Sequence, residues 1–173
     1  MIEIETTKEY TDVTNEWLTN STPNNYKVKI AKYYKYNNVK YYVDGKLVIL
    51  DFTQKEKEMA IWLAKSFGGE IYILSRINYP QKVKTPDYLF RGEKWDLKSI
   101  TKNASSKTRA VDNIIKTSKL QTDNIILDIT DTSICKENII RQAENIFSTS
   151  GREWLKKIMI VDNYNLIKVY ERK

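Results

Sequence analysis

Three residues near the middle of the chain have the types and spacing of a shared chemical site. Asp87 follows Pro86, and an Asp-x-Lys pattern made by Asp96 and Lys98 comes nine residues after it. The intervening glycine predicts a hairpin, and we take Gly92-Glu93 as its two-residue loop. In that register Asp87 faces Lys98 and lies diagonal to Asp96. All three side chains then project from one face, because side chains alternate along a strand.

Such a trio suits metal-dependent phosphodiester chemistry. Two converging carboxylates can hold one hard cation, Mg²⁺ or Mn²⁺, to which the Leu97 carbonyl could add a ligand. Lys98 would then orient the attacking water, help to deprotonate it, or stabilise charge growing on a phosphate. The alternative is a surface hairpin with ordinary charges, since Asp-x-Lys alone is common.

Elements of an α/β domain must position this hairpin. Loop and turn residues separate strands from helices, and hydrophobic periodicity distinguishes the two. We expect a short helix over 12–18, a hairpin over 39–52 bending at Asp44-Gly45, and a helix over 54–67 capped by Thr53. We then expect a strand over 70–76, the hairpin of 87–90 and 94–100, and a helix over 107–119. A strand over 124–130, a helix over 136–147 and strands over 158–161 and 166–170 follow. The prediction is a mixed β-sheet flanked by helices, with an N-terminal extension over 1–45 and the main domain over 46–173.

Composition narrows the chemistry further. The chain has no histidine, which excludes Ser-His-Asp triads and histidine-based ribonucleases. Its net charge of +7 favours a polyanionic partner such as nucleic acid. The one cysteine, Cys135, fits a reducing compartment. No apolar run approaches a membrane span, and the first residues lack the pattern of a signal peptide.

The motif resembles a known nuclease family. Pro86-Asp87 with Asp96-Leu97-Lys98 is similar to the PD-(D/E)xK motif of restriction-endonuclease-like folds. From about Leu50 onward the chain resembles the C-terminal toxin domain of contact-dependent growth inhibition proteins, also found in phage and mobile-element proteins. That resemblance implies a metal-dependent nuclease that acts on tRNA and has a cognate immunity protein. It also implies action in the cytoplasm after delivery as part of a larger polypeptide.

The family also uses a glutamate from the helix before the motif, and two candidates stand there. Glu56 lies on the helix face that carries the apolar residues, whereas Glu58 points with Lys65 toward solvent. We expect Glu56 to complete the metal site with Asp87 and Asp96, because a carboxylate on a core-facing stripe needs a partner. The alternative is a helix-start glutamate favoured by the dipole.

Basic and polar side chains after the motif are candidates for binding the substrate. We expect phosphate contacts from four of them: Lys102, Arg109, Lys119 and Gln121. Lysines and tyrosines also interleave over residues 26–42. They could hold RNA by stacking and charge, or form a sheet edge whose lysines discourage aggregation.

The sequence thus predicts a metal-dependent nuclease, with RNA as its first expected substrate. A DNA endonuclease of restriction, repair or mobile-element type is the alternative enzyme. A nucleic-acid-binding module without activity is the alternative outside enzymes, although the intact Asp87, Asp96 and Lys98 set argues against it.

Overall fold

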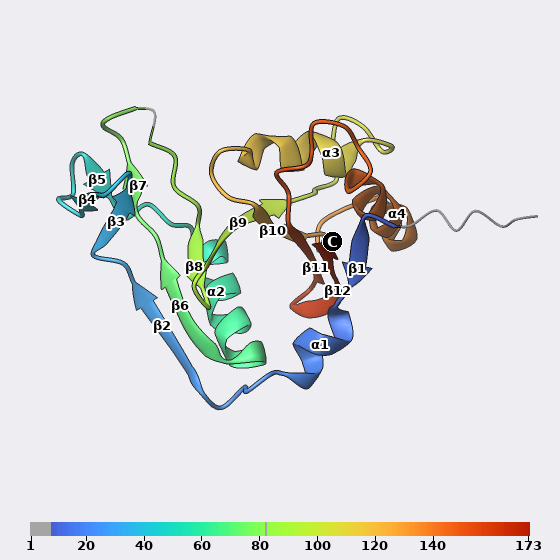
Figure 1. Ribbon diagram of the computed structural model, residues 1–173, viewed down its shortest axis with the longest axis horizontal. Coiled ribbons are helices and arrows are strands. Elements are labelled where there is room, and N and C mark those ends of the chain that lie inside the picture. The colour runs from blue at the N-terminus through green and yellow to red at the C-terminus, as the bar shows by residue number, and fades with distance from the viewer. Residues whose placement is uncertain (1–7, 82) are drawn as a thin grey trace, which may run out of the picture.

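One large mixed sheet forms the centre of the molecule (Figure 1). The computed structural model describes residues 8–81 and 83–173. The sheet has eight strands in the order β1-β12-β11-β10-β9-β8-β6-β2. Along the chain these are β1 (Tyr10–Asp12), β2 (Tyr26–Ile30), β6 (Gly69–Ile73), β8 (Tyr88–Phe90), β9 (Glu93–Ser99), β10 (Asn124–Asp128), β11 (Lys157–Asp162) and β12 (Asn165–Arg172). Strand β10 runs parallel to β9 and β11, and β2 runs parallel to β6, while the other pairs are antiparallel.

Helices cover both faces of this sheet, as predicted. They are α1 (Thr14–Thr19), α2 (Gln54–Phe67), α3 (Ala110–Ile115) and α4 (Lys136–Ile146). Helix α2 packs on one face, where its apolar stripe meets Tyr88 and Trp95 in a buried cluster. Helices α3 and α4 pack on the other face, over Ile125 and Leu127 of β10. Each face therefore has its own core, which makes the hairpin β8–β9 part of a rigid layer.

The predicted hairpin over residues 39–52 is wrong. Strand β4 (Val39–Tyr42) pairs instead with β3 (Tyr33–Tyr36), and β5 (Val48–Ile49) pairs with β7 (Arg76–Ile77). The bend between β3 and β4 is Asn37-Asn38, where both residues have positive φ, as a tight hairpin turn requires. Asp44 does form a turn, since its carboxylate accepts from three following backbone N–H groups, but that turn sends the chain toward β7.

The predicted helix over 107–119 is shorter in the structure. It comprises α3 and a 3₁₀ turn over Lys116–Ser118. Gln142 of α4 explains the late start. Its side chain donates to the carbonyl of Lys107 (2.7 Å) and accepts from the N–H of Val111 (3.1 Å). Those two backbone groups would bond each other in a helix that began at 107, so Gln142 replaces that first turn.

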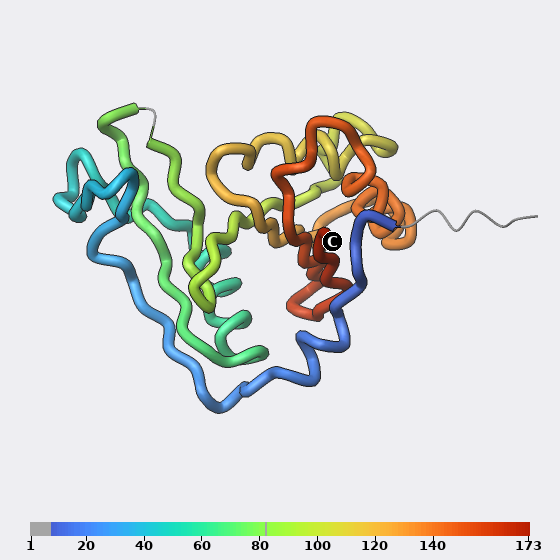
Figure 2. Tube along the Cα trace, in the orientation of Figure 1, coloured from blue at the N-terminus to red at the C-terminus, as the bar shows by residue number. Residues whose placement is uncertain are grey.

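Residues 10–30 contribute to both edges of the sheet. Strand β1 pairs with β12 at one edge, and β2 pairs with β6 at the other. Figure 2 shows the chain passing from one edge to the other through α1. Two strands of the expected N-terminal extension therefore lie within the sheet of the expected main domain. Within the described residues, no helix has the length and apolar character needed to cross a membrane.

Candidate active site

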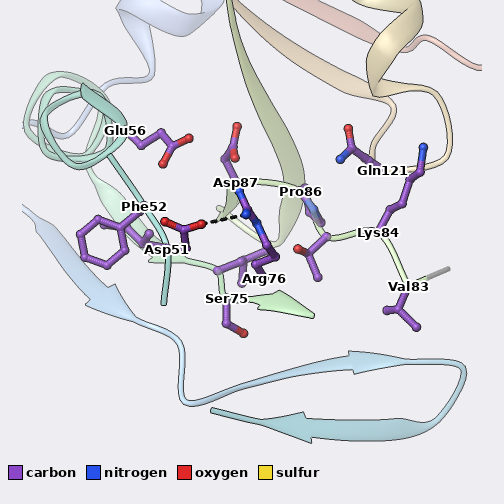
Figure 3. Close-up of a pocket in the computed structure, with 13 residues that line it drawn as sticks. Asp51, Phe52, Glu56, Ser75, Arg76, Val83, Lys84, Pro86, Asp87 and Gln121 are labelled. Atoms are coloured by element: carbon purple, nitrogen blue, oxygen red, sulfur yellow. Dashed lines mark ion pairs between the residues drawn. The ribbon is translucent and has the colours of Figure 1, made fainter. Parts of the chain in front are cut away.

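A pocket of about 250 Å³ lies where the N-terminus of α2 meets the ends of β6 and β8. Its lining is mostly polar, and Asp87, Glu56 and Gln121 all face it (Figure 3). The other lining residues are Asp51, Phe52, Ile73, Leu74, Ser75, Arg76, Val83, Lys84, Thr85 and Pro86. The pocket thus gathers residues from segments that are far apart in the sequence.

The hairpin brings Asp87 and Asp96 together, but in a different register from the predicted one. Leu89 pairs with Lys94, and Phe90 pairs with Glu93. The two-residue loop is therefore Arg91-Gly92. Each residue before the loop pairs with a residue two positions earlier in the sequence than predicted. Continued by one step, this register sets Asp87 directly opposite Asp96. Because the slip is an even number of residues, the shared face of the two carboxylates is retained.

The conformation of Arg91 causes this slip. Arg91 and Gly92 both have positive φ, 53° and 79°, which gives the two central residues of a primed hairpin turn. A positive φ is unusual for arginine. The Arg91 guanidinium donates to the carbonyls of Phe67 and Gly68 at the end of α2, and it lies over the Trp17 ring at 5.3 Å. These contacts stabilise a turn that composition alone disfavours.

Each carboxylate of the pair has its own hydrogen-bond donors. Asp87 Oδ2 accepts from the backbone N–H of Leu97 at 2.7 Å. Asp96, of which 2% is exposed, accepts from the Ser118 hydroxyl at 2.6 Å. Lys98 Nζ lies 3.1 Å from Asp96 Oδ2. The three motif residues are therefore one connected unit, in which Asp96 contacts both a cation and a hydroxyl donor.

Asp87 has the opposite electrostatic environment. Burial, followed by the charge and hydrogen bond of neighbouring Asp96, raises the pKa of Asp87 to about 8, with Glu56 contributing in the same direction. Near neutral pH the two opposed carboxyl groups therefore share one proton. A pair of like charges held this close is characteristic of a site that binds a cation or handles a proton.

The structure places the two candidate glutamates differently. The Glu56 carboxylate points toward Asp87 at the pocket (Figure 3). It also accepts from the N–H of Thr53 at 2.7 Å, while Thr53 Oγ1 accepts from Glu56 N at 3.1 Å, so that Glu56 closes a capping box. Glu58 is exposed and bonds Gln54 and Tyr164 away from the pocket. The preference for Glu56 is a prediction that this placement supports.

The donor set suits a hard divalent cation in part. Asp87 and Asp96 converge, but among the described residues no three acidic or cysteine side chains are arranged as a metal site. Glu56 is held by its capping box. Mg²⁺ usually binds through one or two protein carboxylates, with substrate phosphates and waters completing its shell. Asp87 at the pocket with Asp96 buried directly behind it fits that pattern, whereas the described residues form no cage made only by protein.

Of the four predicted substrate-binding residues, the structure brings Gln121 alone to the pocket. Lys102 and Arg109 are exposed in and after the loop that follows β9, and Arg109 pairs with Asp112 at 3.4 Å. Lys119 is exposed beyond the 3₁₀ turn. Helix α3 is shorter than the predicted helix over 107–119, so residues at the predicted helix ends do not reach the pocket.

Several polar groups at the site could not be expected from the motif. Ser118 follows α3 and is buried against Asp96, but its sequence context is that of an ordinary helix end. Ser75 is fully buried and lines the pocket, and its hydroxyl has no partner within the described part of the chain. Arg76 pairs with Asp51 at 2.8 Å across the pocket mouth (Figure 3). Only the three-dimensional arrangement relates these residues to the motif.

The chain was compared with curated proteins, solved structures and protein-family models. A search of curated proteins finds no match. Among solved structures, the chain is similar to one described as the CdiA-CT/CdiI toxin and immunity complex from Burkholderia pseudomallei, with 21% identity and a TM-score of 0.46 over 66% of this chain and 80% of that one. Residues 84–167, which contain Asp87, Asp96 and Lys98 but exclude Glu56, match the family model described as the contact-dependent growth inhibition CdiA C-terminal domain.

Proposed function

We propose that this protein is a metal-dependent nuclease that hydrolyses phosphodiester bonds at the Asp87–Asp96 pair. The observation that carries the proposal is the opposed pair itself, with buried Asp96 beside half-buried Asp87 and Lys98 Nζ 3.1 Å from Asp96 Oδ2. The match of residues 84–167 to a toxin-domain family supports it, because that segment contains the whole motif.

Asp87 and Asp96 would hold Mg²⁺ or Mn²⁺, with Glu56, which lines the pocket together with Asp87, as the third ligand. A bound divalent cation would neutralise charge on the scissile phosphate and favour attack by water. Asp87 must lose its proton before it can act as a ligand, so its raised pKa couples binding to pH. The carbonyl of Leu97 remains a predicted additional ligand.

Ser118 and Lys98 would orient Asp96 and stabilise the negative charge that develops during the reaction. The Ser118 hydroxyl and the Lys98 ammonium both contact Oδ2 of Asp96 and so fix the orientation of this carboxylate beside Asp87. The Lys98 ammonium, with 22% of its side chain exposed, lies where it can contact the reacting phosphate or water. Its contribution would be largest as negative charge builds in the transition state. The Gln121 amide would offer a neutral donor to the phosphate oxygens.

RNA is the proposed substrate, with tRNA first, on the basis of the family resemblance. The net charge of +7 supports a nucleic acid. An immunity protein that covers the pocket is the partner implied by the same family. The proposed site of action is the cytoplasm, reached as part of a larger delivered protein.

The test is cleavage of tRNA, an unstructured RNA and a DNA duplex, each with Mg²⁺, Mn²⁺ or EDTA, by the wild-type protein and by Asp96→Asn. We expect cleavage of RNA that requires the cation and is lost in Asp96→Asn, with Asp131→Asn as an exposed acidic control. Cleavage of DNA alone would make the protein a DNA endonuclease. Full activity in EDTA, or normal turnover by Asp96→Asn, would overturn the mechanism.

A further inference from the structure

A second and larger hollow lies beside the candidate active site. It is a groove of about 840 Å³ between the β3–β4 hairpin and the strands β6, β8 and β9. Four lysines and three tyrosines line it, with no acidic residue among the lining residues that the structure describes: Lys29, Lys32, Lys35, Lys94, Tyr33, Tyr34 and Tyr72. We call this hollow the tyrosine-lysine groove. Ile30 of β2, Ala31, Leu74 and Leu89 complete the lining, so the groove is aromatic and apolar with a positive charge, although Lys29 pairs with Glu70 at 2.9 Å.

The groove and the carboxylate pair lie on the same face of the sheet. Side chains alternate along a strand, so Lys94 shares a face with Asp96 on β9, and Leu89 shares a face with Asp87 on β8. Leu74 lines both the groove and the candidate active-site pocket. Helices α3 and α4 cover this face over β10 and β11, and α3 reaches β9, where Ser118 meets Asp96. The groove is therefore the open half of the face that ends at the carboxylates.

Cations in and around the groove are held against aromatic rings. Lys94 lies over the ring of Tyr34 at 5.3 Å, and Lys40 lies over the ring of Tyr33 at 4.8 Å. Tyr34 is buried and anchors the hairpin to the core below, whereas Tyr33 is 41% exposed. The hairpin thus holds one ring in place as support and leaves another accessible. Tyr33 also pairs across the hairpin with Tyr42, with ring centroids 5.3 Å apart, so its ring is held in a fixed position.

We propose that the tyrosine-lysine groove binds a run of unpaired nucleotides that continues into the candidate active site. This inference rests on the proposed nuclease function and specifies its substrate. Aromatic rings stack on unpaired bases, whose faces a duplex hides, while lysines follow the phosphates. The positive charge complements a polyanion and argues against a basic protein or a neutral apolar segment as the occupant.

Binding can be measured apart from cleavage in EDTA, using fluorescently labelled oligo(U) RNA, oligo(dT) DNA and a duplex of the same length. We expect both single strands to bind more tightly than the duplex. Tyr33→Leu should weaken binding of the single strands about tenfold, since one stacked base is lost, while Tyr33→Phe should bind like the wild type. Tyr26→Leu is the matched control, because Tyr26 has the same exposure of 41% and lies outside the groove.

A charge series tests the phosphate path independently. Lys35→Gln should make the slope of log affinity against log salt shallower by about 0.7, the value for one phosphate contact on a single strand. Lys65→Gln, on the outer surface of α2, should leave the slope unchanged. Tighter binding of RNA than of DNA would identify contacts to the 2′-hydroxyl, whereas equal binding would place recognition in phosphates and base faces. Either result supports the groove.

Two outcomes would overturn the inference. One is tighter binding of the duplex together with no effect of Tyr33→Leu, and the other is equal weakening by Tyr33→Leu and Tyr26→Leu. The proposed nuclease function and the groove can be refuted independently of each other. If the groove variants behave as expected but no substrate is cleaved with Mg²⁺ or Mn²⁺, the groove stands without the nuclease. If cleavage depends on Asp96 but not on Tyr33, the nuclease stands without the groove.

Discussion

Replacing Asp87 by asparagine should stabilise the protein at alkaline pH while abolishing its activity. In the folded protein Asp87 keeps its proton up to about pH 8, whereas in the unfolded chain it loses the proton near 3.8. Between these values the folded state binds more protons than the unfolded state, so the free energy of unfolding must fall as pH rises. Asparagine is neutral throughout and can still accept from the Leu97 N–H, so Asp87→Asn removes this dependence.

The magnitude follows from the two pKa values. Each pKa unit is worth about 1.4 kcal/mol, so the interval from 3.8 to about 8 sets a ceiling of about 6 kcal/mol. Water entering the pocket and movement of the Lys98 ammonium toward the pair relieve part of this penalty. We therefore expect the free energy of unfolding of the wild type to fall by about 2–4 kcal/mol between pH 5 and pH 8.5 through this group.

The assay is urea unfolding followed by tryptophan fluorescence in EDTA at constant ionic strength, at several pH values. The wild type and Asp87→Asn should have similar stability near pH 5, and the variant should be more stable at pH 8.5. Asp131→Asn, at an exposed position, should follow the wild type. Parallel decline of the wild type and Asp87→Asn would refute the shared proton, and with it the close approach of the two carboxyl groups.

Three further substitutions test individual roles in the site. Glu56→Gln should lower turnover at least tenfold and leave stability within about 0.5 kcal/mol, because glutamine also closes a capping box; Glu58→Gln is its control, and a larger effect of Glu58→Gln would reverse the assignment. Lys98→Met should lower the rate of single-turnover cleavage at least about a hundredfold and weaken RNA binding by the equivalent of one phosphate contact. If RNA binding collapses while the bound RNA is cleaved at the normal rate, Lys98 is a phosphate anchor. Ser118→Ala should reduce turnover about tenfold and lower the free energy of unfolding by about 1–3 kcal/mol, since Asp96 loses its hydroxyl donor. The control Thr117→Ala, at the exposed neighbouring position, should change neither quantity. Equal effects of the two substitutions would show that Ser118 matters only to the turn.

The grouping of the three motif residues was predictable because it depends on alternation and not on register. The sequence places Asp87, Asp96 and Lys98 on one face for any even shift of pairing, so the two-residue slip at Arg91 changed their neighbours but not their grouping. The slip itself was beyond local reasoning. Arg91 adopts a positive φ because carbonyls at the end of α2 bind its guanidinium, and those carbonyls are more than 20 residues away.

Elements that depend on distant partners were missed for the same reason. Strand β1 has three residues and pairs with β12 across almost the whole chain, so nothing near Tyr10 in the sequence marks it as a strand. The start of α3 is set by Gln142, and the burial of Ser118 depends on how α3 packs on β9. By contrast, α2 was predicted at both ends, because Thr53, Glu56 and the glycines after Phe67 are local signals.

Because β1 lies at one edge of the sheet, the fold should resist a pulling force differently at its two ends. A force applied ahead of residue 10 meets a strand of three residue pairs, which can peel from β12 one pair at a time. A force applied at the C-terminus must instead extract β12, which is bonded on one side to β1 and on the other to β11. A motor that pulls proteins through a pore would therefore unfold this molecule at lower force from its N-terminal side, and the sheet would open at the edge farthest from β2.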